Sequence, residues 1–457
     1  MPTTSHKIIT KTVEAPAAML GRAVLMTQVV REASANNPVV RKGRDYWLML
    51  GPGLTTGASD DDPSGIATYS QTGAQFGFNL LWLAPWTLPL MATVQEMCAR
   101  IGLVTGRGLA GNIRVFYSKK VLYMCTLLLF AANAFNIGAD LGAMAKAVQL
   151  LSPHLNFSWL VVGLAIFSLL LQIFTPYVRY AKYLKWLALI LLSYILSAVL
   201  AHPHWGTVLS HGFIPHLTWN KDEILLVCAI LGTTISPYLF FWQTSQEVEE
   251  QVLEGKLTLH DRRHTEAADV KAMRIDVWSG MFLSNLVMFF IIAATGAILF
   301  PHGIREITSA AQAAEALRPF AGNATYFLFA IGIIGTGLLA IPVLAGSSSY
   351  ALAESLRWKE GLYRDLGQAK AFYGIIIISM LVGLGINFIG LDPIKALIYA
   401  AIGNAIVSPV VIFFIVRISS SKKVMGGWAN KKATTVVGWL VFGLMLAAAV
   451  AAIYSLF

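Results

Sequence analysis

Charged side chains are scarce in this sequence. Asp, Glu, Lys and Arg make up only 13% of its 457 residues, against about 25% in an ordinary soluble protein. Cysteines are few, and Cys98, Cys125 and Cys228 all lie inside apolar stretches, so neither a disulfide framework nor a thiolate metal cluster is predicted. No nucleophile triad, zinc motif, phosphate loop or sizeable soluble domain occurs, so we do not expect an enzyme.

Apolar residues are abundant instead, at 56% of the chain, with a mean hydropathy of +0.64. Several runs reach the roughly 20 residues that a helix needs to cross a bilayer. We therefore predict an all-α integral membrane protein with eleven transmembrane helices, near residues 46–77, 79–103, 119–149, 157–175, 179–200, 223–247, 275–300, 324–353, 371–389, 394–416 and 434–456. Residues 1–45 are polar and basic, with no evident cleavable signal peptide, and are expected to form a cytoplasmic tail before a membrane domain at 46–457.

The net charge of +10 comes from basic residues that are concentrated on one side of the predicted helices. All but five of the 34 Lys and Arg residues fall in the tail and at the loops on one side of the predicted helices; the exceptions are Lys146, Lys221, Arg305, Arg318 and Lys395. This asymmetry follows the positive-inside rule and predicts a cytoplasmic N-terminus and an external C-terminus, in a bacterial inner membrane. A basic tail and five short basic loops are not the pattern of a nucleic-acid binder, so the expected partner is the lipid bilayer.

The first predicted helix is interrupted by the polar stretch GASDDDPSG at residues 57–65. Backbone within a membrane must satisfy its own hydrogen bonds, yet Pro63 lacks an N–H and Gly65 relaxes the chain. Carbonyl groups released at this point need partners, and a bound cation can be one of them. The three carboxylates beside the proline favour that interpretation.

The sixth predicted helix has a matching interruption, LGTTISP, at residues 231–237. Two broken helices, five helices apart and opposite in direction, are typical of a five-plus-five inverted repeat with the substrate at the midplane. The repeats would cover about 46–200 and 223–416, followed by an extra helix at 434–456. The alternative, two proline kinks packed against neighbours, leaves the carboxylates unexplained.

Asp62 directly precedes Pro63 and is the predicted principal metal ligand. Asp60 and Asp61 are expected either to face an aqueous vestibule or to support the ligand indirectly. The second break would add carbonyl oxygens near Thr233 and Thr234 and the hydroxyl of Ser236. A site of oxygen donors without a thioether favours Mg2+ and Mn2+ over softer metals. The ion is expected as a transported substrate, and no cofactor is predicted.

Several motifs resemble the NRAMP family of divalent metal transporters over essentially the whole membrane domain. They are Gly51-Pro52-Gly53, Asp62-Pro63-Ser64-Gly65, Gly73-Ala74-Gln75, Leu80-Leu81-Trp82 and Val104-Thr105-Gly106-Arg107. The resemblance implies a LeuT-like fold in which helices 1 and 6 are broken. It also implies an alternative function, proton-coupled transport of Mn2+ or Fe2+.

Three positions depart from the family pattern and shape the site together with Pro63 and Pro237. Gly65 stands at the family's asparagine, Ser236 at its methionine and Tyr238 at its histidine. These departures resemble the NRAMP-related magnesium transporter branch, which is reported to move Mg2+ and Mn2+ without protons. Gly65 and Tyr238 would remove ligands and leave room for a partly hydrated ion.

The resemblance also bears on proton coupling. Asp140 matches one of the family's acidic positions in helix 3, whereas Asn133 and Ala143 stand at two others. Without a continuous relay, transport is predicted to be uncoupled from protons, with Asp140 on the ion path. Gln243 and Glu247 share one helix face, and they could line the inner exit path or form a solvated helix end.

Other polar residues support fewer conclusions. Asn404 is expected to make a hydrogen bond between helices, and Glu96 and Glu354 to be solvated at cytoplasmic helix ends. Lys146 could point outward or approach Asp140. The histidines of the external loop, His202, His204, His211 and His216, fit no standard metal spacing. A more distant alternative function is organic-solute transport on the same fold, although Asp62 would repel a carboxylate substrate.

Overall fold

The computed structural model describes residues 38–175, 177–218, 220–307, 310–390 and 393–455. The chain divides into two units, residues 1–50 and 51–457. In the first unit, helix α2 (Pro38–Met49) includes residues 38–45, which were assigned to the tail. The rest of the predicted tail, residues 1–37, lies outside the described residues.

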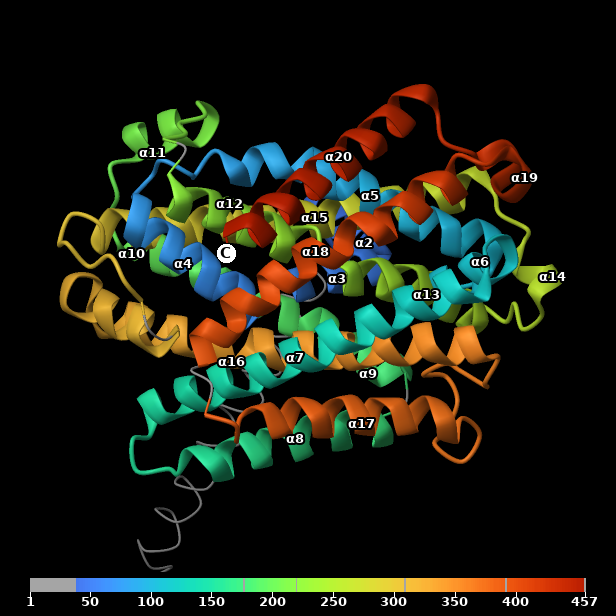
Figure 1. Cartoon of the computed structure of the whole chain (residues 1–457), viewed down its shortest axis with the longest axis horizontal. Helices are drawn as coiled ribbons and strands as arrows, with labels where there is room; N and C mark the ends of the chain where they lie inside the picture. Colours follow the sequence, from blue (N-terminus) through green and yellow to red (C-terminus); the bar gives the residue numbers. More distant parts are fainter. Residues whose placement is uncertain (1–37, 176, 219, 308–309, 391–392, 456–457) are drawn as a thin grey trace, which may run out of the picture. The chain divides into compact units, whose positions relative to one another are not determined.

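All regular elements of the described part of the second unit are helices (Figure 1). They are α3 (Pro52–Asp60), α4 (Pro63–Phe76), α5 (Leu83–Thr105), α6 (Leu109–Phe116), α7 (Lys119–Leu151), α8 (Phe157–Phe174), α9 (Tyr177–Leu187), η1 (Ala188–Leu191), α10 (Leu192–Leu200), α11 (Trp205–Phe213), α12 (Lys221–Thr234), α13 (Pro237–Leu253), α14 (Leu259–Arg262), α15 (Ala267–Ile298), α16 (Ala310–Leu356), α17 (Lys370–Ile386), α18 (Pro393–Ser419), α19 (Lys422–Met425), η2 (Gly426–Trp428) and α20 (Lys432–Ser455). The all-α prediction is confirmed.

Eight helical stretches in the described residues are long and apolar enough to cross a membrane, and α17 is a shorter apolar helix. They include α7, α8, α15 and α20 as single helices. The broken first segment, divided into α3 and α4, has no single helix of that length. The membrane character predicted from composition is thus confirmed, and the count of eleven spans stays a prediction.

The first break lies between α3 and α4, at Asp61 and Asp62. Pro63 has no N–H, so the carbonyl of Ser59, four residues earlier, has no donor in its own helix. Asp62 is the N-cap of α4, and its Oδ1 accepts a hydrogen bond from the Gly65 N–H at 2.7 Å. The side chain predicted as a ligand therefore also starts the second half of the helix.

The second break lies between α12 and α13, at Ile235 and Ser236. Pro237 withholds the donor that the Thr233 carbonyl would use. The Ser236 hydroxyl replaces it, donating to the Thr233 carbonyl at 2.7 Å and to the Gly232 carbonyl at 2.8 Å. Both breaks predicted from Gly and Pro are confirmed.

Helix α15 packs along both halves of the first broken helix. The approach is close because glycines face each other: a Cβ added to Gly57 would lie 2.2 Å from the Gly280 carbonyl oxygen. Small residues allow such backbone contact between membrane helices. Helices α7, α16 and α17 run side by side (Figure 1), and α18 contacts α4, α7 and α12. The two breaks are thereby enclosed by long helices.

Candidate ion site at the two helix breaks

The two breaks meet at Gly65 and Tyr238. The Tyr238 hydroxyl donates to the Ser59 carbonyl at 2.8 Å, supplying the donor that Pro63 withholds. A Cβ added to Gly65 would lie 3.1 Å from the Thr233 Oγ1 and 3.3 Å from the Tyr69 ring. The extra room expected beside Gly65 is therefore absent in this structure, because Thr233 and Tyr69 fill it. The glycine instead lets the two breaks approach each other.

Asp62 is 1% exposed and is held by three neutral groups. Its Oδ1 accepts hydrogen bonds from the Ser64 hydroxyl at 2.6 Å and from the Gly65 N–H, and its Oδ2 accepts from the Asn136 Nδ2 at 3.0 Å. These donors orient the carboxylate without neutralising it. The side chain is thus a buried oxygen donor held in one orientation, and its role as a metal ligand stays a prediction.

Three further carboxylates, those of Asp60, Asp61 and Asp140, are fully buried. Asp60 Oδ2 accepts from the Ser284 hydroxyl at 2.7 Å. Asp60 Oδ1 and both carboxylate oxygens of Asp61 and Asp140 have no hydrogen-bond partner among the described residues. The expectation that Asp60 and Asp61 face an aqueous vestibule is wrong for this structure, because the surrounding helices exclude them from solvent.

No salt bridge within the described ranges involves Asp60, Asp61, Asp62 or Asp140. The charge of Asp62 acts on both Asp60 and Asp140, so the group is mutually repulsive when ionised. Burying charge without a partner costs several kcal/mol even after relaxation. Protons or a mobile cation are the means by which such a cluster is neutralised.

The second break contributes oxygen donors without charge. The Thr234 hydroxyl donates to the Ile230 carbonyl at 2.8 Å within α12, and Ser236 is engaged with carbonyls of its own break. Thr233 places its Oγ1 against Gly65 of the first break. A carbonyl or hydroxyl oxygen that accepts one hydrogen bond keeps a second lone pair, so these oxygens can still coordinate an ion.

Asn136 was missed by the sequence interpretation. Its Nδ2 holds Asp62, while its Oδ1 is buried with no partner among the described residues. The sequence does carry a signal, since Asn133, Asn136 and Asp140 recur at spacings of three and four in an apolar helix. This spacing places them on one face. Asn133 lies against α16, where its Nδ2 donates to the Ser347 hydroxyl at 2.8 Å.

The predicted path residues on α13 bond to each other. The Gln243 Nε2 donates to the Glu247 Oε1 at 2.9 Å, and both side chains are buried. A solvated helix end is therefore not what this structure shows. Their role in an exit path remains a prediction.

The N-terminus of α3 is capped by a residue from another helix, Asp276 of α15. Its carboxylate accepts from the N–H groups of Gly51 at 2.8 Å, Gly53 at 2.6 Å and Leu54 at 3.0 Å. A negative charge at this position also complements the helix dipole. The sequence interpretation did not identify this contact, because the capping residue lies more than 200 positions from the helix that it caps.

The solvated roles predicted for Glu96 and Glu354 are wrong. Glu96 is buried and accepts from the Arg274 Nε at 3.0 Å and the Trp278 Nε1 at 2.9 Å. Glu354 is also buried and accepts from the Gly111 N–H at 2.7 Å. Each carboxylate joins helices that are distant in sequence, so their helix-end positions did not predict their surroundings.

Two other polar residues have clear outcomes. Neither polar atom of the Asn404 side chain has a hydrogen-bond partner among the described residues, so the predicted bond between helices is absent. Lys146 places its Nζ 5.0 Å from the centre of the Phe157 ring. It therefore contacts the start of α8, which is the outward alternative.

Elsewhere, His, Cys, Asp and Glu side chains are the other residue types that could hold a metal ion. Within the described ranges, no group of three or more His, Cys, Asp or Glu side chains is arranged to hold a metal ion. An ion at the breaks would thus need amide, hydroxyl and carbonyl oxygens besides Asp62. His202, His204 and His211 line a cavity of about 390 Å³ without forming such a group. The three cysteines are buried and free, as predicted.

Two broken membrane helices whose interruptions meet beside a buried carboxylate define a transporter of the inverted-repeat class. Comparison with known families agrees with this assignment. The profile of the Nramp family (natural resistance-associated macrophage protein-like) matches residues 53–455, and the chain belongs to that family.

The chain matches known divalent metal cation transporters over most of their length. The divalent metal cation transporter MntH of Caldanaerobacter subterraneus is 24% identical over 407 residues, covering 88% of this chain and 92% of the relative. MntH of Clostridium acetobutylicum is 24% identical over 439 residues, covering 92% and 93%. The absence of enzyme motifs in the sequence is consistent with these relatives.

Solved structures share the fold. A manganese transporter of Eremococcus coleocola matches with a TM-score of 0.67 at 20% identity, covering 90% of this chain and 87% of that one. Mhp1, a nucleobase-cation-symport-1 family transporter in a closed conformation, matches with a TM-score of 0.50 at 13% identity, covering 89% and 92%. The predicted LeuT-like fold is confirmed.

Proposed function

We propose that this protein transports divalent metal ions across a membrane, with Mg2+ and Mn2+ as its substrates. The observation that carries the proposal is Asp62, a buried carboxylate held only by neutral donors where the two helix breaks meet. The MntH relatives are divalent metal cation transporters, and one structure with this fold is a manganese transporter.

Oxygen atoms alone would hold the ion. Asp62 is the principal ligand, the carbonyls at Thr233 and Thr234 and the Ser236 hydroxyl come from the second break, and Asn136 adds an amide oxygen that has no other partner. No methionine lies at either break. Hard oxygen donors suit Mg2+ and Mn2+, and Mg2+ usually retains several waters.

The proposed transport is not coupled to protons. Tyr238, at the position of the family histidine, uses its hydroxyl to bond the Ser59 carbonyl. Asn133 bonds α16, and Asp140 has no neighbouring acid on α7 that could pass a proton onward. The membrane potential can drive the ion by itself, since two charges gain about 4.6 kcal/mol per 100 mV.

The proposed setting is a bacterial inner membrane, with the N-terminus in the cytoplasm and the C-terminus outside. Gln243 and Glu247 would line the inner exit path. Asp60, Asp61 and Asp140 would lie along the ion path beside Asp62. Opening of this path requires movement of the helices that bury these side chains.

Proteoliposomes test the proposal directly. Vesicles containing the protein, a metal indicator and a pH dye are given Mg2+ or Mn2+ while a potassium gradient sets the membrane potential. We expect both ions to enter, faster at negative internal potential, with no change in luminal pH beyond that of protein-free vesicles. Luminal acidification that follows metal entry would establish the proton-coupled Mn2+ or Fe2+ alternative. Amino-acid uptake without metal flux would establish an organic-solute transporter.

A further inference from the structure

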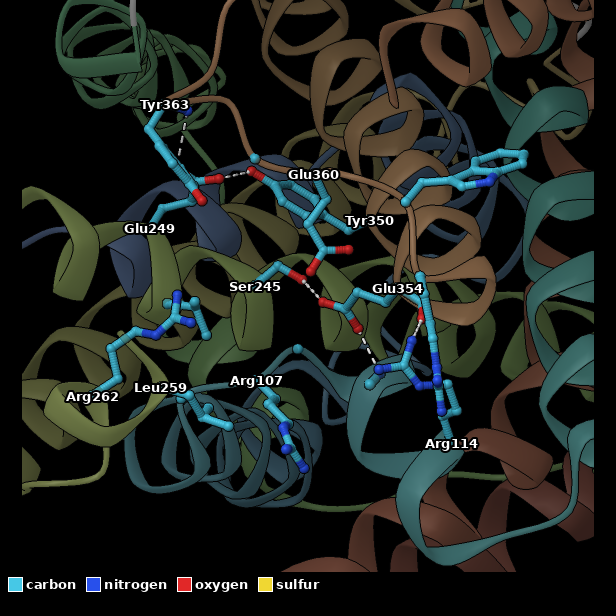
Figure 2. A pocket seen from close by; sticks show the side chains of 17 residues that line it. Arg107, Arg114, Ser245, Glu249, Leu259, Arg262, Tyr350, Glu354, Glu360 and Tyr363 are labelled. Atoms are coloured by element: carbon cyan, nitrogen blue, oxygen red, sulfur yellow. Dashed lines mark hydrogen bonds between the residues drawn. The ribbon is translucent and has the colours of Figure 1, made fainter. Parts of the chain in front are cut away.

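A second polar cavity lies apart from the helix breaks, at the ends of α13 and α16 and beside α6 and α14 (Figure 2). Its volume is about 350 Å³, within the range of small-molecule sites. None of Asp60, Asp62, Asp140 or Tyr238 lines it. The charge pattern along the chain predicts that this cavity faces the cytoplasm.

Two of the three carboxylates at this cavity are satisfied by donors of the protein. Glu249 accepts from the Tyr350 hydroxyl and from the N–H groups of Leu362 and Tyr363. Glu354 accepts from the Gly111 N–H and, at 3.5 Å, from the Ser245 hydroxyl. Figure 2 shows both carboxylates directed toward these donors. They therefore serve to hold the walls of the cavity together.

The third carboxylate belongs to Glu360. Its Oε2 is buried and has no hydrogen-bond partner among the described residues. Burial, and then the charge of Glu354, raise the pKa of Glu360 to about 9. The raised pKa favours the protonated form of Glu360, while the charges of Arg114 and Arg262 favour the ionised form.

The positive charge of the cavity is only partly offset: Arg114 donates to the Glu354 carbonyl, and its charge acts on the Glu354 carboxylate. Arg107, Arg114, Arg262 and Arg357 all line the cavity, and none of them forms a salt bridge with a described residue. The Nε of Arg262 is buried with no hydrogen-bond partner there. Burial, and then the charges of neighbouring arginines, lower the pKa of Arg107 from its ordinary value. Four guanidinium groups that line one cavity without a salt bridge to a described residue favour an anion over a metal ion as the ligand.

Aromatic rings complete the lining. Trp358 is 45% exposed and Tyr363 is 38% exposed, although both belong to the cavity wall. Guanidinium groups match phosphate oxygens with paired hydrogen bonds, and flat aromatic side chains stack on nucleobases. We propose that this cavity binds a phosphate-bearing anion of the nucleotide class, with the arginines on the phosphates and the aromatic rings on the base.

The test is calorimetric titration of the full-length protein in phosphatidylcholine nanodiscs with ATP, pyrophosphate and adenosine. EDTA is present, so the result does not depend on metal transport. We expect ATP and pyrophosphate to bind, more weakly as salt increases, and adenosine not to bind. Absence of ATP and pyrophosphate binding at millimolar concentration would overturn the proposal.

Paired variants locate the site. Arg107→Gln combined with Arg262→Gln should weaken ATP and pyrophosphate binding at least about tenfold, because each removes a charged hydrogen-bond donor. Lys422→Gln combined with Lys423→Gln removes the same charge from exposed residues outside the cavity and should leave the affinity within about twofold. Equal affinities in the two double variants would overturn the proposal.

Two single variants identify the chemistry. Trp358→Ala should weaken ATP binding by about fivefold or more, but not pyrophosphate binding, through loss of base stacking. Glu360→Gln should change neither ATP affinity nor pyrophosphate affinity by more than about twofold. A loss as large as that of the arginine variants would mean that the cavity does not select anions.

Phosphatidylglycerol discs provide the final comparison. Protection of Arg107 and Arg262 from guanidine-specific labelling by that lipid, without ATP binding in phosphatidylcholine discs, would assign the cavity to a lipid headgroup and reject the nucleotide.

Discussion

The two broken helices solve the same backbone problem in different ways. In each, a proline leaves one carbonyl without a donor. At the second break the Ser236 hydroxyl satisfies the Thr233 carbonyl locally, whereas at the first break Tyr238 of α13 satisfies the Ser59 carbonyl. The first break also carries the three buried aspartates, and the second carries only neutral groups.

The N-terminal ends of the two broken helices show the same contrast between a local partner and a distant one. Helix α12 is capped by its own Asn220, whose Oδ1 accepts from the Glu223 N–H at 2.8 Å. Helix α3 has no such side-chain cap of its own and depends on Asp276 of α15. Both ends of α3 are thus secured by other helices.

The largest expected effect is loss of the charged ligand at the first break. Asp62→Ala should reduce Mg2+ and Mn2+ flux by at least about 100-fold, since removing one partner of a buried ionic contact costs about 3–5 kcal/mol. Proteoliposome flux measures this, with size-exclusion elution as the folding control. Asp60→Ala and Asp61→Ala should lose less. Normal flux in Asp62→Ala but not in these variants would assign the ion to another carboxylate.

The next largest effect concerns how α3 is held. Asp276→Ala should lower the stability of the α3 N-terminus by about 2–4 kcal/mol, because three N–H groups lose a charged acceptor. Hydrogen exchange should accelerate at Gly53 and Leu54. Asn220→Ala is the matched control at α12 and should cost only about 1 kcal/mol. Equal changes in exchange at both helix ends would remove the proposed difference between them.

A smaller effect is expected from the bond that joins the two breaks. Tyr238→Phe leaves the Ser59 carbonyl without its donor, at a cost of about 1–2 kcal/mol. Metal affinity, measured from the concentration dependence of flux, should fall by up to about tenfold. Unchanged affinity would show that the contact between the breaks does not contribute to the ion-binding arrangement.

The smallest effect should come from Ser236→Ala. Its hydroxyl bonds carbonyls within its own break and is one neutral oxygen among several proposed ligands. We expect a loss in metal affinity of about threefold, which is typical of one neutral hydrogen bond. A larger loss than in Tyr238→Phe would mean that the Ser236 hydroxyl contributes more to metal affinity than the bond between Tyr238 and Ser59.

Some residues of the site could be recognised from the sequence, and others could not, because their roles depend on contacts with distant parts of the chain. Asp62, Pro63, Ser236 and Pro237 were recognised from the sequence because a missing N–H acts on a carbonyl only four residues away. Asn136 could have been found from its spacing to Asp140. Asp276 could not, because its importance depends on a contact with α3 that no local pattern encodes.

The sequence by itself determined the membrane class, the two breaks and the carboxylates beside the first of them. These features follow from apolar run length, the chemistry of proline and residue identity, all of which act within a few positions along the chain. Only the tertiary structure decided that Gly65 lies against Thr233, that Tyr238 caps Ser59, and that Glu96 and Glu354 are buried. The physical reason is that buried polar groups take partners wherever helix packing provides them, and helix packing brings together residues far apart in the chain.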